Sequence, residues 1–136
     1  MILKNPKETF EYGKKLAGEL NPNTVIALTG DLGAGKTTLA QAIAKGLGIE
    51  EKITSPTFTV VCEYDSGRIP LYHFDVYRVH DSEELFEIGL EDYFKRGGIC
   101  LIEWADLIEG GILPDDTINI KLEYGENDEE RILTII

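Results

Sequence analysis

The chain has 136 residues, 43% of them hydrophobic and 28% charged, which is ordinary for one globular domain spanning residues 1–136. Its formal net charge of −12, with only four arginines, argues against a free-standing nucleic-acid binder, because lysine and arginine bind phosphate backbones. No apolar run approaches the ~18 residues of a membrane helix, and the first ten residues lack a signal-peptide pattern. We therefore expect a cytoplasmic protein whose acidic surface either maintains solubility or meets a basic partner.

The first half of the chain alternates between helix and strand signals. A helix is predicted over residues 5–20, with Asn5 as its cap and Pro6 at its first position. Residues 24–28 are a short apolar run with β-branched side chains, typical of a strand buried on both faces. Residues 37–48 are rich in helix formers and have apolar side chains four positions apart. A glycine-rich loop separates this strand from the second helix.

The second half favours strands. Residues 57–78 read as two strands joined by the turn "DSGR", and residues 81–94 as one helix with acids in its first turn. Residues 98–104 form another apolar strand. Residues 117–124 and 131–136 flank the turn "ENDEE" and predict a C-terminal β-hairpin. This order of elements favours an α/β domain with a mixed β-sheet flanked by helices.

The loop "TGDLGAGKTT" at residues 29–38 contains the clearest chemical motif. Gly30, Gly35, Lys36 and Thr37 match G-x-x-x-x-G-K-[ST], and the predicted strand before it and helix after it are the context that this motif requires. The glycines let the backbone curl so that its N–H groups face phosphate oxygens. Lys36 can reach the β- and γ-phosphates, and the Thr37 hydroxyl can bind Mg²⁺. The sequence therefore predicts a nucleoside triphosphate with magnesium.

A magnesium site also needs a carboxylate, and two acids end apolar strands. Glu103 ends "ICLIE" and Asp75 ends "PLYHFD". They can divide two tasks, one binding Mg²⁺ and the other positioning the attacking water. The alternative for each is an acid on the surface at a strand end. The segment "SPTF" at residues 55–58 is either a switch that senses the γ-phosphate or a plain Ser-Pro turn.

The nucleotide base is weakly encoded. The sequence lacks N-K-x-D, the pattern expected of a guanine site, so adenine is favoured. Kinases of nucleosides and nucleotides use several arginines to close over a second phosphate, and the four arginines here are scattered. ATP is thus the expected nucleotide, and a small phosphotransferase acting on a nucleoside or metabolite is the weaker alternative.

The motifs "GDLGAGKTT", "SPTF", "YHFDVYR" and "IEW" occur in this order in a short chain, and together they resemble the TsaE (YjeE) family. Members of this family are bacterial ATPases needed to form threonylcarbamoyladenosine on tRNA. The resemblance runs from the first predicted helix to the last strand pair. It implies a P-loop NTPase-like mixed sheet flanked by helices, with a C-terminal β-hairpin.

The resemblance also implies roles for individual residues. Lys36, Asp75 and Glu103 would be the catalytic residues, with Asp75 close to the γ-phosphate. Thr37 and Glu103 would bind the metal, and Trp104 would lie beside the site or plug the core. The residues expected to bind the nucleotide are Thr9, Gly33, Ala34, Gly35, Lys36, Thr37, Thr38 and Arg131, with Thr9 and Arg131 near the base and sugar.

The function implied by the resemblance is Mg²⁺-dependent ATP hydrolysis that serves a complex of TsaB and TsaD. TsaD carries the transferase chemistry and TsaB supports it, so this chain would meet tRNA only indirectly, through the complex. An ATP-sensing subunit without productive hydrolysis is the other alternative, because binding and hydrolysis use the same residues.

Overall fold

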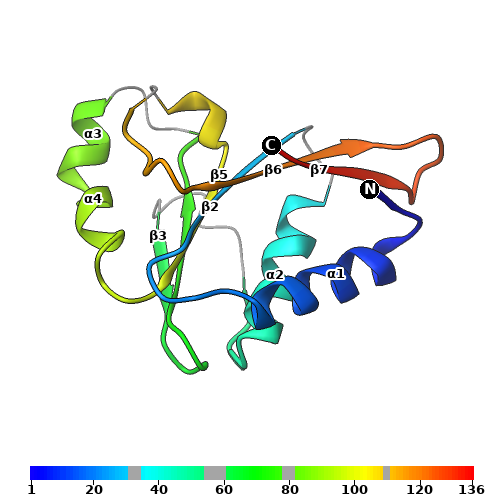
Figure 1. Ribbon diagram of the computed structural model, residues 1–136, viewed down its shortest axis with the longest axis horizontal. Helices are drawn as coiled ribbons and strands as arrows, with labels where there is room; N and C mark the ends of the chain where they lie inside the picture. The colour runs from blue at the N-terminus through cyan, green and yellow to red at the C-terminus, as the bar shows by residue number, and fades with distance from the viewer. Residues whose placement is uncertain (31–34, 54–60, 78–81, 109–110) are drawn as a thin grey trace.

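The computed structural model describes residues 1–30, 35–53, 61–77, 82–108 and 111–136. Its elements form one mixed sheet with helices on both sides (Figure 1). In chain order they are β1 (Ile2–Leu3), α1 (Pro6–Gly18), β2 (Val25–Gly30), α2 (Lys36–Gly46), β3 (Val61–Tyr64), β4 (Leu71–Asp75), α3 (Ser82–Glu87), α4 (Leu90–Tyr93), β5 (Ile99–Glu103), the 3-10 helix η1 (Ala105–Leu107), β6 (Ile118–Tyr124) and β7 (Arg131–Ile135).

The sheet has the strand order β1-β7-β6-β2-β5-β4-β3. Strand β2 lies at its centre and is parallel to both β5 and β6, while β4 is parallel to β5. Strands β3, β7 and β1 add antiparallel pairs, and β6 with β7 forms the C-terminal hairpin. The predicted mixed sheet and hairpin are confirmed. Because β2, β4 and β5 run the same way, their carboxyl ends meet at one edge.

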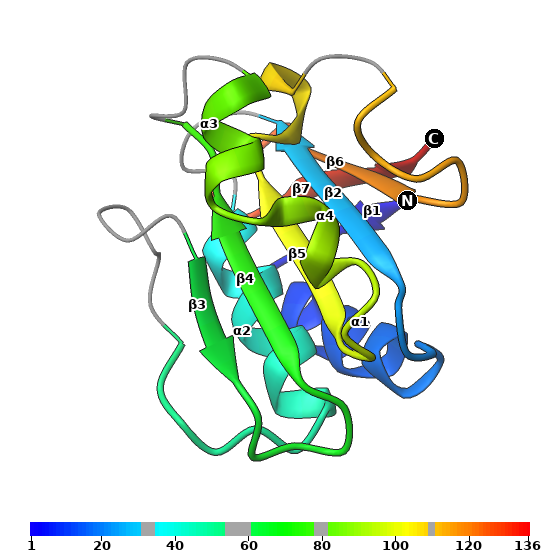
Figure 2. The ribbon, with the colours of Figure 1, turned by 90° about the vertical axis from the view of Figure 1, so that its left-hand side faces the viewer.

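Two hydrophobic layers cover the faces of the sheet. Helices α1 and α2 lie on one face, and α3 and α4 lie on the other (Figure 2). Strand residues alternate between the layers, so Leu71 and Leu101 pack with α1 and α2, while Phe74 and Ile102 pack with α3 and α4. By this alternation, the odd-numbered residues of β4 and β5 face α1 and α2.

The helix predicted over residues 81–94 is wrong as a single element. The chain forms two short helices, α3 and α4, which are separated at Gly89. Gly89 has φ of 77°, a left-handed conformation that an α-helix cannot contain and that glycine adopts without penalty. By contrast, α1 begins as predicted, since the Asn5 side chain accepts a hydrogen bond from the Glu8 amide at 2.9 Å.

The helices of the described ranges are short. The longest, α1, has 13 residues and is amphipathic rather than apolar all round. None of the described helices is long and apolar enough to cross a bilayer.

Candidate functional site

The glycine-rich loop connects the central strand to α2, as its motif requires. Strand β2 ends at Gly30, and α2 begins at Lys36 after Gly35, which has φ of 97°. Gly30 has φ of 128°, and a Cβ atom there would lie 1.8 Å from the carbonyl oxygen of Leu122 on β6. Only glycine fits at this position, because the neighbouring backbone cannot give way. Residues 31–34, including the predicted Gly33 and Ala34, lie outside the described residues.

Lys36 is buried at the carboxyl edge of the sheet, with 5% of its surface exposed. Its Nζ donates a hydrogen bond to the Gly30 carbonyl oxygen at 3.2 Å and lies 3.6 Å from the centroid of the Trp104 ring. Trp104 follows β5 with φ of 63°, and the Tyr77 ring packs on it at 4.8 Å between centroids. Trp104 therefore lies beside the loop lysine, and it also packs against the hydrophobic layer formed with α3 and α4.

The two predicted acids lie side by side at the same edge. Asp75 and Glu103 are register partners at the ends of β4 and β5, and Glu103 also pairs with Leu28 of β2. Their exposed fractions are 9% and 3%, so the alternative that they are surface acids is wrong. Asp75 Oδ1 accepts a hydrogen bond from the Tyr77 amide at 3.0 Å. The carboxyl edge of an open α/β sheet is where such folds bind ligands.

A third titratable side chain, which the sequence analysis did not assign, lies beneath the acids. His73 of β4 is fully buried, and its Nε2 lies 2.5 Å from Oε2 of Glu103. Within the described part of the chain, its Nδ1 has no hydrogen-bond partner. The signal that could have found it is spacing, since residues two apart on a strand share a face and His73 precedes Asp75 by two.

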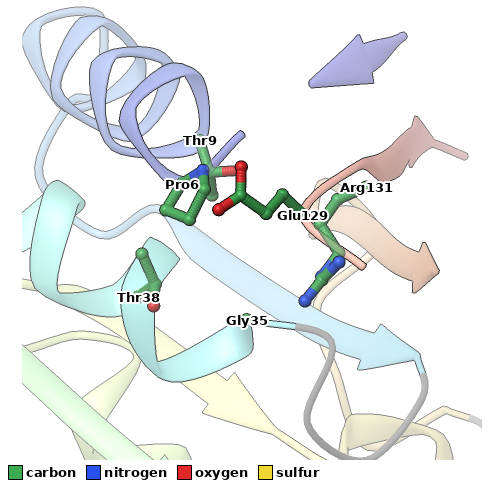
Figure 3. Close-up of a pocket in the computed structure, with 6 residues that line it drawn as sticks. All are labelled: Pro6, Thr9, Gly35, Thr38, Glu129 and Arg131. Atoms are coloured by element: carbon green, nitrogen blue, oxygen red, sulfur yellow. The ribbon is translucent and has the colours of Figure 1, made fainter. Parts of the chain in front are cut away.

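A pocket of about 50 Å³ lies beside the start of α2 (Figure 3). Glu129 and Arg131 extend toward it from the β6–β7 hairpin, and Thr9 and Thr38 reach it from α1 and α2. The structure thus brings together four residues predicted to bind nucleotide, namely Thr9, Gly35, Thr38 and Arg131. Glu129 was missed, although its place two residues before Arg131 in the turn could have suggested it. The complete lining is Pro6, Thr9, Gly35, Thr38, Glu129 and Arg131.

Arg131 is held within its own hairpin. Its Nη1 donates to the carbonyl oxygens of Asp128 and Glu130 at 2.7 and 2.8 Å, and its guanidinium carbon lies 4.7 Å from the centroid of the Tyr124 ring. These contacts order a long side chain at the pocket, so less conformational entropy remains to be lost when it binds a ligand.

The oxygen ligands at this edge of the sheet are few, which suits Mg²⁺ bound together with a nucleotide better than a metal bound by protein side chains alone. The described residues contain no cluster of three or more His, Cys, Asp or Glu side chains arranged to hold a metal. Mg²⁺ is usually bound by one or two carboxylates together with phosphate oxygens and water. The half-buried Thr37 is the second residue of α2, which follows the loop, and the buried Glu103 ends β5, which pairs with the strand before the loop. The "SPTF" segment lies outside the described residues.

Comparisons with known proteins agree with this architecture. A family model described as "Threonylcarbamoyl adenosine biosynthesis protein TsaE" matches residues 3–133. A Bacillus subtilis relative named tRNA threonylcarbamoyladenosine biosynthesis protein TsaE is 47% identical, over 94% of this chain and 79% of the relative. A Treponema pallidum relative of the same name is 40% identical, over 89% of this chain and 88% of the relative.

A solved structure supports the same assignment. The crystal structure of Bacillus subtilis YdiB matches with a TM-score of 0.84 and 40% sequence identity, covering 99% of this chain and 82% of that one. The P-loop NTPase-like fold predicted from the motifs is thereby confirmed. Because the family model spans almost the whole chain and relatives align over most of their length, the chain belongs to the TsaE family of threonylcarbamoyladenosine biosynthesis proteins.

Proposed function

We propose that this chain is a Mg²⁺-dependent ATPase that serves a TsaB–TsaD complex during threonylcarbamoyladenosine formation on tRNA. The observation that carries the proposal is the convergence of buried Lys36, Asp75 and Glu103 at the one sheet edge where the glycine-rich loop begins. Burying three ionisable groups is costly, so a site that uses their charges is the simplest account of them. The names of the relatives support the tRNA pathway.

The phosphates are bound by the loop and the start of α2. The first N–H groups of α2 have no partner within the helix and attract negative charge, and α2 begins directly after Gly35. Lys36 exchanges its contact with the Gly30 carbonyl for the β- and γ-phosphate oxygens. The ammonium group is already buried in the free protein, so binding needs only a short movement of this side chain.

The carboxylates divide the remaining work. Thr37 and Glu103 would hold Mg²⁺, and the bound ion would supply positive charge that neutralises the phosphates. Asp75 orients the attacking water, and its hydrogen bond from the Tyr77 amide fixes the direction of its carboxylate. Both acids are shielded from bulk water. Electrostatic interactions in such a buried site are stronger than on the protein surface.

The pocket lined by Thr9, Thr38 and Arg131 holds the sugar and base. Arg131→Ala is expected to weaken ADP binding about tenfold, which corresponds to ~1.4 kcal/mol and is typical of one lost polar contact. Isothermal titration calorimetry measures the effect. Arg96→Ala is the matched control, because it removes the same charge from the distant α4 side, where Arg96 lies on the Tyr93 ring. Equal affinities of the two variants would contradict the assignment.

The acidity of the chain agrees with a role that leaves tRNA to other proteins. A net charge of −12 repels a phosphate backbone and favours a basic protein surface. The direct test incubates the purified chain with Mg²⁺ and ATP, with and without TsaB and TsaD, and measures phosphate release. We expect slow release alone and faster release with both partners. Absence of release in both conditions, or transfer of phosphate to an added nucleoside, would overturn the proposal.

A further inference from the structure

The pairing of His73 with Glu103 follows from the register of β4 and β5. His73 lies opposite Leu101, and Asp75 lies opposite Glu103, so His73 and Glu103 are diagonal neighbours on one face of the sheet. The imidazole is fully buried, and the carboxylate is 3% exposed. Among the described residues, His73 is the side chain that hydrogen-bonds Glu103.

Nothing about the core requires a polar side chain at this position. Leu71, two residues earlier on the same strand and face, packs into the apolar layer with α1 and α2. An imidazole at residue 73 is costly, because it buries two ring nitrogens and, within the described ranges, only Nε2 has a partner. The contact with Glu103 is therefore the feature that accounts for a histidine here.

This hydrogen bond constrains the carboxylate. A glutamate side chain has three rotatable bonds, and ordering it costs conformational entropy. The contact of Nε2 with Oε2 therefore restricts the orientations that the Glu103 carboxylate can adopt. Carboxylates that bind metals are commonly held by hydrogen bonds of this kind, and their loss typically weakens metal affinity 10- to 100-fold.

We propose that His73 is a positioning residue, which holds the Glu103 carboxylate in the orientation that binds Mg²⁺. The inference rests on the proposed function, since it takes Glu103 as the metal ligand. His73 acts through Glu103 alone and does not touch the nucleotide. Replacing His73 should therefore change the affinity of the nucleotide complex for the metal and should not change how Lys36 binds the phosphates.

The test measures metal binding directly, without turnover. Mn²⁺ replaces Mg²⁺, and electron paramagnetic resonance follows the loss of the free Mn²⁺ signal as the full chain is added with ADP. His73→Leu keeps an apolar side chain of suitable size, and we expect Mn²⁺ affinity to fall about tenfold. His73→Gln places an amide nitrogen near the position of Nε2, and we expect its Mn²⁺ affinity to lie within about threefold of that of the unaltered protein.

The controls separate the outcomes. Cys100→Ala changes a buried residue of β5 on the opposite face and should leave Mn²⁺ affinity unchanged. If His73→Leu does not fold, His73→Asn replaces it, because its shorter amide cannot reach Glu103 and predicts the same tenfold loss. The inference would be overturned if His73→Leu or His73→Asn left the Mn²⁺ affinity unchanged. It would also be overturned if His73→Gln lost as much Mn²⁺ affinity as those variants.

The Glu103→Gln variant shows whether a negative result contradicts only the role of His73 or the proposed function as well. If Glu103→Gln weakens Mn²⁺ binding and His73→Leu does not, Glu103 is the ligand and only the role of His73 is wrong. If neither variant weakens it, the metal site itself is misassigned and the positioning role falls with it.

Discussion

Lys36→Ala is expected to lower the kcat for ATP hydrolysis by about 10²- to 10³-fold, the usual effect of removing one charged group aimed at a reacting centre. Lys36 is buried, and its ammonium group lies 3.2 Å from the carbonyl oxygen of Gly30, the last residue of β2. Phosphate release under saturating ATP measures the loss.

The matched control is Lys45→Ala, because Lys45 lies on the same helix, in its last turn and exposed to solvent. It removes the same charge at the opposite end of α2 and should leave kcat unchanged. The single tryptophan of the chain, Trp104, provides a second measurement. Its ring contacts the Lys36 ammonium, so ATP should change its fluorescence in the unaltered protein. An equal kcat in the two variants would contradict the role of Lys36.

Glu103→Gln is expected to lower kcat by about 10²-fold or more and to raise the Mg²⁺ concentration needed for half-maximal turnover about tenfold. The amide keeps the size of the side chain but lacks the charge that a hard cation prefers. Glu103 is 3% exposed, so water cannot readily replace the carboxylate. A titration of turnover against Mg²⁺ at fixed ATP measures both quantities.

Asp75→Asn is the matched comparison, since Asp75 is the register partner of Glu103 and is similarly buried. If Asp75 orients water, its substitution lowers kcat about 10²-fold and leaves the Mg²⁺ dependence nearly unchanged. If Asp75→Asn raised the Mg²⁺ concentration for half-maximal turnover and Glu103→Gln did not, Asp75 would be the metal ligand and Glu103 the residue that orients water. Equal shifts would mean that both carboxylates bind the metal.

The central part of the site could be predicted from local sequence. The loop motif requires a strand before it and a helix after it, and the apolar run before Glu103 predicts a buried strand that ends in an acid. These signals are local, and β2, α2 and β5 form where they predict. The resemblance added Thr9 and Arg131, which are far apart in sequence and line one pocket.

Features that depend on tertiary contacts were not predictable in the same way. Strand β1 has two residues and exists because it pairs with β7 across the length of the chain. The helix over residues 81–94 breaks at Gly89, although the composition around it favours helix. His73 was missed because its spacing from Asp75 shows only that the two share a face, whereas its hydrogen-bond partner Glu103 follows from the register of β4 and β5.

We propose that ATP hydrolysis, and not ATP occupancy alone, is the working signal of this chain. The most direct measurement is tRNA modification in a reconstituted mixture of the chain, TsaB, TsaD and tRNA, with an activated threonylcarbamoyl donor supplied so that no other step consumes ATP. With tRNA in excess over protein, ATP should support many rounds of threonylcarbamoyladenosine formation, and a non-hydrolysable ATP analogue should support no more than one. Repeated rounds with the analogue would show that hydrolysis is not needed and would identify the chain as an ATP-sensing subunit.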